Sequence, residues 1–226
     1  MTKLRKEGFE IIRDVFSTDE LSLMRNAADQ LAANAGSACV RHISSKSEFF
    51  ANLAISKKIH QLIPSNLLPV RSILFDKTPA QNWPVAWHQD LTIAVTTEKE
   101  IAEYGPWSFK DGSPHVQPPA ELLNQMTTVR IHLDDTPSHN GALKVIAETH
   151  HLGKIPSTEV KQHSQAEAVT CECLAGDVLL MSPLILHSSS RSEKPKRRRI
   201  LHFDFAPHSA LHPELSWYEQ LLTHHR

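Results

Sequence analysis

The stretch Arg198–Ala206, which reads RRILHFDFA, alternates two kinds of side chain. Successive side chains on a β-strand point to opposite faces of the sheet. One face of this strand is therefore mostly apolar and the other is polar: the first carries Arg199, Leu201, Phe203 and Phe205, and the second carries Arg198, Ile200, His202 and Asp204. The apolar face is suited to packing against helices, and the polar face is suited to lining a cavity.

A second stretch, Met126–Asp134, repeats this alternation. Its apolar face carries Val129, Ile131 and Leu133, and its polar face carries Arg130, His132 and Asp134. Two strands of this kind fit a barrel that has helices outside and a polar cavity inside. They also fit two ordinary half-exposed strands, and the alternation alone does not separate the two interpretations.

Short β-type runs separated by turns occupy most of the chain after residue 70. The runs are Val70–Asp76, Val85–Val95, Met126–Leu133, Ala142–Ala147, Ala168–Leu174, Val178–His187 and Ile200–Ala206. Turn residues such as those at Asn140-Gly141 and Gly176-Asp177 separate them. Several short strands with no helical pattern between them predict a sandwich, jelly roll or barrel rather than a parallel α/β sheet.

The first 69 residues have a helical pattern after one short edge strand at Gly8–Arg13. Ser17 followed by Glu20 three residues later is a capping box, which predicts a helix start. The helix behind it places apolar residues on one stripe and ends near Gly36. A second helical stretch is predicted from about Ser47 to Ile63, because Pro64 follows it.

Composition and charge indicate a single globular domain. The chain has 226 residues, of which 40% are hydrophobic and 22% are charged, with a net charge of -1. Neither nucleic acid nor an anionic membrane is favoured by such a balance, and no apolar run is long enough to span a bilayer. With three cysteines and no visible signal peptide, we expect a cytoplasmic protein.

We expect this domain to cover residues 1–226 in three parts. Residues 1–69 would form a mostly helical support, residues 70–206 a β core and residues 207–226 a C-terminal tail. Within the core, the segment 98–120 is rich in proline and glycine and contains two aromatic residues, which is typical of an ordered loop beside a site.

The run Val85–Val95, VAWHQDLTIAV, carries an imidazole and a carboxylate two residues apart. On a strand, His88 and Asp90 would share one face, and together they would supply two ligands of a 2-His-1-carboxylate iron site. A buried ion pair or a pair at a rim is the simpler alternative. The best candidate for a third ligand is His187, at the end of an apolar run; it also fits a solvent-exposed residue at a strand end.

Four stretches give the chain a resemblance to the phytanoyl-CoA dioxygenase family of Fe(II)- and 2-oxoglutarate-dependent oxygenases. They are GFEIIRDVFSTDELSLMRNAADQL near the N-terminus, WHQD at 87–90, HLDDTPSHNGALKVIAETHHLG at 132–153, and AGDVLLMSPLILHSSSRSEKPKRRRILHFDFA at 175–206. The resemblance implies a double-stranded β-helix, a cupin-like jelly roll braced by N-terminal helices. It also implies that His88, Asp90 and His187 are the iron ligands.

The same resemblance implies a set of side chains that bind 2-oxoglutarate. Family spacing places the cosubstrate arginine at Arg198, which the alternation also puts on the polar face; Arg197 or Arg199 would replace it if the preceding turn is bulged. A guanidinium suits this role because it binds a carboxylate through two parallel hydrogen bonds and stays charged. Further cosubstrate contacts are expected from Ser189, Lys77 and Arg130.

The reaction implied is the hydroxylation of a small molecule by Fe(II), 2-oxoglutarate and O2, with release of succinate and CO2. No catalytic residue beyond the metal ligands is expected. Because the segment 98–120 should roof the site, Trp107, Phe109 and His115 are candidate substrate contacts, although Trp107 and Phe109 would equally serve to pack the loop. We expect a small metabolite rather than a coenzyme A thioester.

Two other functions remain open from the sequence. A non-catalytic, cupin-like protein that binds a metal or ligand would use the same three residues. A nucleic-acid binder could use the basic run Lys194–Arg199, although this run is single and lacks stacking aromatic residues. The expected partner is a small-molecule substrate, with no nucleic acid and no membrane, and the sequence predicts no oligomeric state.

Overall fold

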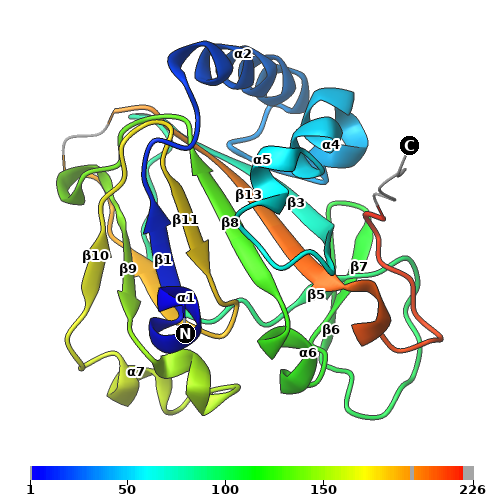
Figure 1. The fold of residues 1–226 in the computed structure, drawn as a ribbon. Coiled ribbons are helices and arrows are strands. Elements are labelled where there is room, and N and C mark those ends of the chain that lie inside the picture. The colour runs from blue at the N-terminus through cyan, green and yellow to red at the C-terminus, as the bar shows by residue number, and fades with distance from the viewer. Residues whose placement is uncertain (1, 194–195, 221–226) are drawn as a thin grey trace.

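Two antiparallel sheets dominate the computed structural model, which describes residues 2–193 and 196–220 (Figure 1). The larger sheet has the order β1-β11-β8-β13-β3-β2 and the smaller has the order β10-β9-β12-β4. Their strands are β1 (Phe9–Ile12), β2 (Cys39–Arg41), β3 (Leu67–Lys77), β4 (Val85–His88), β8 (Thr127–His132), β9 (Leu143–Ile146), β10 (Val169–Cys171), β11 (Val178–Met181), β12 (Leu186–Ser189) and β13 (Arg198–Pro207). The expected jelly roll is confirmed.

Helices α2 to α5 cover the outer face of the larger sheet. In chain order the helices are α1 (Lys3–Glu7), α2 (Thr18–Ala35), α3 (Ile43–Lys46), α4 (Glu48–Ala54), α5 (Lys57–His60), α6 (Ala120–Asn124) and α7 (Val160–His163), with single 3-10 turns at η1 (Ser138–Asn140), η2 (Thr149–Leu152) and η3 (His208–Ala210). The predicted capping box at Ser17 and Glu20 starts α2, and Gly36 ends it with φ of 60°. The second predicted helix is divided, because Ser56 caps a new start at α5.

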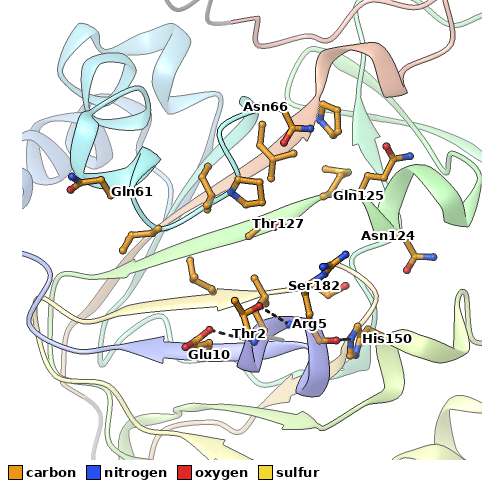
Figure 2. Close-up of a pocket in the computed structure, with 18 of the residues that line it drawn as sticks. Thr2, Arg5, Glu10, Gln61, Asn66, Asn124, Gln125, Thr127, His150 and Ser182 are labelled. Atoms are coloured by element: carbon orange, nitrogen blue, oxygen red, sulfur yellow. Dashed lines mark hydrogen bonds between the residues drawn. The ribbon is translucent and has the colours of Figure 1, made fainter.

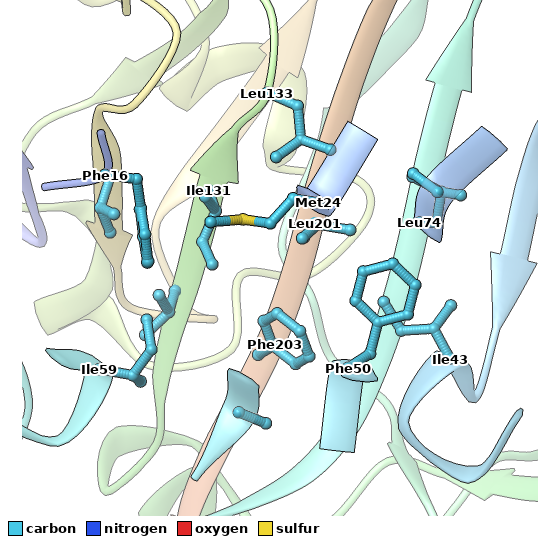
Figure 3. Packing of buried hydrophobic residues seen from close by; sticks show 14 of the residues in the cluster. Phe16, Met24, Ile43, Phe50, Ile59, Leu74, Ile131, Leu133, Leu201 and Phe203 are labelled. Atoms are coloured by element: carbon cyan, nitrogen blue, oxygen red, sulfur yellow. The ribbon is translucent and has the colours of Figure 1, made fainter. Parts of the chain in front are cut away.

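The apolar face of β13 forms the main core with helices α2 to α5 (Figure 3). Leu201 and Phe203 are fully buried, together with Met24 of α2, Phe50 of α4 and Ile59 of α5. Burial of each such side chain is worth about 1.5–3 kcal/mol. The prediction that this face packs against helices is therefore confirmed.

The polar face of β13 points toward the smaller sheet. In the antiparallel register, Arg198 lies opposite Lys77 of β3, and His202 lies opposite Arg130 of β8. These four side chains line a cavity between the two sheets. The interpretation as a barrel with a polar interior holds, and that of two ordinary half-exposed strands does not.

Two of the predicted strands are each broken in two. The run Val85–Val95 leaves the sheet after His88 and pairs again only at β5 (Ile93–Ala94). The run Val178–His187 divides into β11 of the larger sheet and β12 of the smaller one, with Pro183 in the turn between them. Proline cannot donate a ladder hydrogen bond, which explains the second break.

The segment 98–120 contains a hairpin. Strands β6 (Trp107–Lys110) and β7 (Ser113–Val116) pair with each other, and β7 also pairs with β5 to form a third, three-stranded sheet. This hairpin places His115 and Lys110 at the cavity between the two main sheets.

The C-terminal segment packs against the domain as far as residue 220. Trp217 forms an isolated bridge to Val95 and is buried, and the carboxylate of Glu219 accepts hydrogen bonds from the backbone and hydroxyl of Ser72. The last six residues of the expected tail, 221–226, lie outside the described residues. Among the helices in the described ranges, none has both the length and the apolar character needed to cross a membrane.

Candidate metal centre

His88, Asp90 and His187 meet at one point between the two sheets. The His88 Nε2 atom lies 3.9 Å from one Asp90 carboxylate oxygen, and the His187 Nε2 atom lies 3.8 Å from the other. One ligand atom from each residue lies within 4.8 Å of the other two. Within residues 2–193 and 196–220, this is the one group of three or more such side chains that could hold a metal ion.

Both histidines are oriented by the same backbone contact. The His88 Nδ1 atom donates to the carbonyl of Ala86 at 2.8 Å, and the His187 Nδ1 atom donates to the carbonyl of Ile185 at 2.9 Å. A carbonyl can only accept, so each Nδ1 carries a proton, and Nε2 is the nitrogen that each ring directs toward Asp90 and a metal. In metal sites, a hydrogen bond from the imidazole nitrogen that does not bind the metal usually fixes the orientation of the ring. The donor set therefore fits a divalent metal.

Gln89 fixes the chain where β4 ends, a role that the sequence does not reveal. Its side-chain amide donates to the carbonyls of Gly153 and Leu184, and its oxygen accepts from the amide of Ile155. The amide of Asp90 donates to the carbonyl of Pro183. Long-range hydrogen bonds thus replace the strand pairing and hold Asp90 beside His88, although Asp90 is not on a strand.

The surroundings of Asp90 and His187 keep these two ligands in the state that a metal requires. Burial opposes ionisation of Asp90, but the charges of His187 and Arg71 outweigh it and lower its pKa to about 2. Burial lowers the pKa of His187 to about 4, despite the opposing charge of Asp90. The site therefore offers one carboxylate and neutral imidazole at neutral pH, which are the protonation states that bind metals.

A cavity of about 240 Å³ extends from the three residues along the polar faces of both sheets. Of the side chains predicted to bind a cosubstrate, Arg198, Ser189, Lys77 and Arg130 all line it. Ser189 is two residues after His187 on β12, so its side chain points to the same face.

Arg198 is the one of the three consecutive arginines that reaches this cavity. Its guanidinium is buried, and its Nη1 lies 3.4 Å from the carbonyl of Asn140. Burial, and then the charge of Arg130, lower its pKa to about 10, so it stays charged. No carboxylate among the described residues pairs with it.

Its two neighbours are engaged elsewhere. Arg197 binds Asp76 and Asp29, and Arg199 binds Asp134 through two hydrogen bonds and Asp29 through a third. The basic run that suggested a nucleic-acid site is therefore largely neutralised within the protein at these two positions. Its residues 194–195 lie outside the described residues.

Lys77 and Arg130 are buried cations with neutral partners. The Lys77 ammonium donates to the carbonyl of Trp83 at 2.7 Å and lies 4.6 Å from the centre of its ring. Burial, together with the charges of Arg198 and Arg130, lowers the pKa of Lys77 to about 7. The Arg130 Nη1 atom donates to His202 Nδ1 at 3.0 Å, and its Nε is buried without a partner in the part of the chain that is described.

The three predicted substrate contacts lie in different surroundings. His115 is buried and lines the cavity. Trp107 packs against the apolar cluster around Trp217, and Phe109 is 72% exposed; neither lines the cavity. The sequence does not single out Arg71, Lys110 and Thr92, which line the cavity near His115.

A larger cavity, of about 840 Å³, lies on the outer face of the larger sheet between α1 and the turn after α5 (Figure 2). Its polar side chains are mostly engaged in local contacts: Glu10 accepts from the amide of Leu4, and His150 Nε2 donates to the carbonyl of Arg5. It holds none of the three candidate ligands. The smaller cavity is therefore the candidate functional site.

Sequence comparison identifies one family. The family model described as phytanoyl-CoA dioxygenase (PhyH) matches residues 4–200, which is most of the chain. A search of curated protein sequences finds no match.

Solved structures share the fold at low sequence identity. The non-heme alpha ketoglutarate dependent carbocyclase SnoK from nogalamycin biosynthesis is 17% identical, with a TM-score of 0.72 over 98% of this chain and 95% of that chain. The epimerase SnoN in complex with Fe3+, alpha ketoglutarate and nogalamycin RO is 17% identical, with a TM-score of 0.70 over 91% and 81%. HygX from Streptomyces hygroscopicus with nickel and 2-oxoglutarate bound is 16% identical, with a TM-score of 0.63 over 92% and 87%.

Proposed function

The chain belongs to the phytanoyl-CoA dioxygenase family, and we propose on this premise that it is an Fe(II)- and 2-oxoglutarate-dependent dioxygenase that hydroxylates a small molecule. The convergence of His88, Asp90 and His187, with both imidazoles set to offer Nε2, carries the proposal. The solved structures with iron, nickel or 2-oxoglutarate bound support it through their shared fold.

The chemistry that the metal would supply is the activation of O2 at the expense of 2-oxoglutarate, which yields succinate, CO2 and an oxidised C–H bond. Two histidines and one carboxylate leave coordination positions open for cosubstrate and O2. The protein itself would orient the reactants and exclude water. A general base is not required for this reaction, and we assign no catalytic residue beyond the three ligands.

Arg198, Ser189 and Lys77 would hold the distal carboxylate of 2-oxoglutarate. The Arg198 guanidinium can donate two parallel hydrogen bonds to a carboxylate, and the Ser189 hydroxyl can donate another. Arg198 lies directly across from Lys77 in the register of β13 and β3, so both cations meet the same end of the cavity. Arg130, on the neighbouring strand β8 and opposite His202, would contact the cosubstrate from the side.

The size of the cavity supports a small substrate. Its volume of about 240 Å³ is smaller than the roughly 300–1,000 Å³ of sites that bind drug-sized ligands. A coenzyme A thioester would need a much longer groove with its own phosphate contacts. Of the three predicted substrate contacts, we therefore retain His115 and assign Trp107 and Phe109 to the packing and surface of the hairpin.

A test of this function measures succinate formed from 2-oxoglutarate by the purified protein with Fe(II), ascorbate and air. We expect slow formation of succinate without substrate, and loss of that activity in His187→Ala. The alternative, a non-catalytic cupin-like binder, would bind metal and 2-oxoglutarate but form no succinate. Equal activity in wild type and His187→Ala would contradict the proposed site.

A further inference from the structure

The cavity carries more positive charge than iron and 2-oxoglutarate account for. Six basic residues line it, and the single acidic residue among the lining side chains is Asp90. The basic residues are Lys77, Arg198, Arg130, Arg71, Lys110 and Arg41. If Lys77 and Arg198 hold the cosubstrate, as proposed above, the last three remain without a function.

These three residues, which we call the second basic end, lie far from Arg198. Arg71 and Lys77 are on the same face of β3 and six residues apart, which corresponds to about 20 Å along a strand. Asp90 lies within electrostatic range of Arg71 as well as of His187, so the metal ligands adjoin the Arg71 end of the cavity. The five-carbon chain of 2-oxoglutarate is much shorter than this span, so a cosubstrate bound at Arg198 does not reach Arg71.

Arg71 is held by one ion pair and one hydrogen bond, and part of its guanidinium has no hydrogen-bond partner among the described residues. Its Nε lies 2.6 Å from the carboxylate of Asp204, and its Nη1 donates to the carbonyl of Thr92 at 2.9 Å. Asp204 is itself fixed by hydrogen bonds from Thr128 and His202. Across the ranges that the structure describes, neither Nε nor Nη2 makes a hydrogen bond, and the residue lines the cavity.

Lys110 and Arg41 complete this end from the hairpin and from β2. Arg41 pairs with Asp111 at 2.9 Å, whereas the Lys110 ammonium, which also lines the cavity, has no hydrogen-bond or ion-pair partner among residues 2–193 and 196–220. Burial, and then the charges of Arg71 and Arg41, lower the pKa of Lys110. Arg41 and Arg71 each have a carboxylate partner, so Lys110 is the cation at this end that a bound anion would stabilise most.

His115 adds a polar atom that lacks a partner at the same end. Its Nδ1 donates to the carbonyl of Ser113 at 3.2 Å, which leaves Nε2 as an acceptor. Nε2 is buried and makes no hydrogen bond within the described chain. Burial lowers the pKa of this ring to about 4, so it is neutral at neutral pH. A buried acceptor of this kind usually has a partner, here a bound ligand.

We propose that the primary substrate is a small molecule bearing an oxyanion, either a carboxylate or a phosphate group, and that Arg71 and Lys110 bind this group. His115 accepts a hydrogen bond from a hydroxyl or amine of the same molecule. The anion is thereby anchored on the side of the metal opposite to Arg198, which orients the rest of the substrate toward the metal. This inference rests on the proposed function, because it assigns the other basic end to 2-oxoglutarate.

The test uses protein loaded with 2-oxoglutarate and Mn(II), a redox-stable substitute for Fe(II), so that the end of the cavity at Arg198 and Lys77 is occupied. Inorganic phosphate and propionate are then titrated by calorimetry at constant ionic strength. We expect saturable binding of at least one of them, and a loss of at least about tenfold in affinity in Lys110→Met. Lys161→Met, at an exposed position on α7, is the matched control and should bind like wild type.

Tighter binding of phosphate would assign a phosphate or phosphonate substrate, and tighter binding of propionate a carboxylic acid. Absence of saturable binding would overturn the inference. Unchanged binding in Lys110→Met would also overturn it, because the anion would then lie on the metal or on the surface. Binding of Mn(II) and 2-oxoglutarate is measured first in the same samples; its failure would refute the proposed function, whereas its success without anion binding would refute this inference alone.

Discussion

His88 and His187 lie directly opposite each other in the register of β4 and β12, with their ring centroids 4.2 Å apart. Each ring donates its Nδ1 proton to the carbonyl two residues before it, at Ala86 and Ile185. The two imidazoles are therefore set by the backbone of their own strands, before any metal arrives. Such preorganisation lowers the cost of binding a metal, since neither ring has to change its tautomer or its orientation.

Gln89 holds the end of β4, and its loss should weaken both the fold and the metal site. In Gln89→Leu, the carbonyls of Gly153 and Leu184 and the amide of Ile155 lose their partner. Leaving buried polar groups unpaired costs about 1–3 kcal/mol each. We expect the free energy of unfolding to fall by at least about 2 kcal/mol in urea titrations. Gln162→Leu on exposed α7 should change it little, and equal losses in both variants would contradict this role.

Gly141 provides the space in which Arg198 lies. Its φ is 72°, and a Cβ atom there would lie 2.9 Å from the carbonyl oxygen of Ser190 and 3.1 Å from Arg198 Nη1. Gly36 has a φ of 60° with nothing within 4 Å of its Cβ position. Gly141→Ala should therefore raise the KM for 2-oxoglutarate, whereas Gly36→Ala should cost only the backbone strain of about 1 kcal/mol. A normal KM in Gly141→Ala would argue against Arg198 as the cosubstrate contact.

Arg198 and Arg199 are adjacent but face opposite ways, so their loss should have different consequences. Removing the partner of a buried charge costs about 2–5 kcal/mol, and we expect Arg198→Ala to weaken 2-oxoglutarate binding by about 30-fold or more. Arg199→Ala should lower stability, because Asp134 and Asp29 lose their partner, and leave 2-oxoglutarate affinity unchanged. Calorimetry and thermal melts separate the two effects. The reverse pattern would mean that Arg199 is the cosubstrate arginine.

Lys77 should link 2-oxoglutarate binding to pH. Its pKa falls from 10.5 to about 7 in the folded protein, so between these values the unfolded chain binds more protons and stability rises with pH. An arriving carboxylate favours the charged ammonium, so binding at pH 8 should take up a proton. Calorimetry in buffers of different ionisation enthalpy measures this uptake. We expect Lys77→Met to abolish this proton uptake. We also expect Lys77→Met to be more stable than wild type below pH 7. Proton uptake equal to that of wild type would contradict a role of Lys77 in binding 2-oxoglutarate.

The fold was largely predictable from residues that alternate. Leu201 and Phe203 against Arg198 and His202 gave both faces of β13, because burial on one side and a cavity on the other impose a period of two. The capping box at Ser17 is equally local. The break after His88 was not predictable, since it depends on hydrogen bonds of Gln89 to positions far away in the chain, whereas Pro183 marks the break between β11 and β12 locally.

The residues of the candidate site also divide into those that the sequence predicted and those that it did not. The three ligands stand out because residue type and family spacing mark them, and the structure brings them together. Gln89 and the pair of Arg71 with Asp204 were missed, because their partners are distant in sequence and their types are common on surfaces. Trp107 and Phe109 could not be placed either, since the direction of a side chain in the hairpin depends on how the hairpin packs.

The most direct test of the central claim is an anaerobic titration of the protein with Fe(II) and 2-oxoglutarate, followed by visible absorption. If His88, Asp90 and His187 hold iron beside a 2-oxoglutarate site, wild type should develop the weak visible band of a 2-oxoglutarate chelate of Fe(II). His187→Ala should not develop it, and His163→Ala on α7 should behave like wild type. A wild-type protein that binds neither component, or a His187→Ala variant with an undiminished band, would contradict the account.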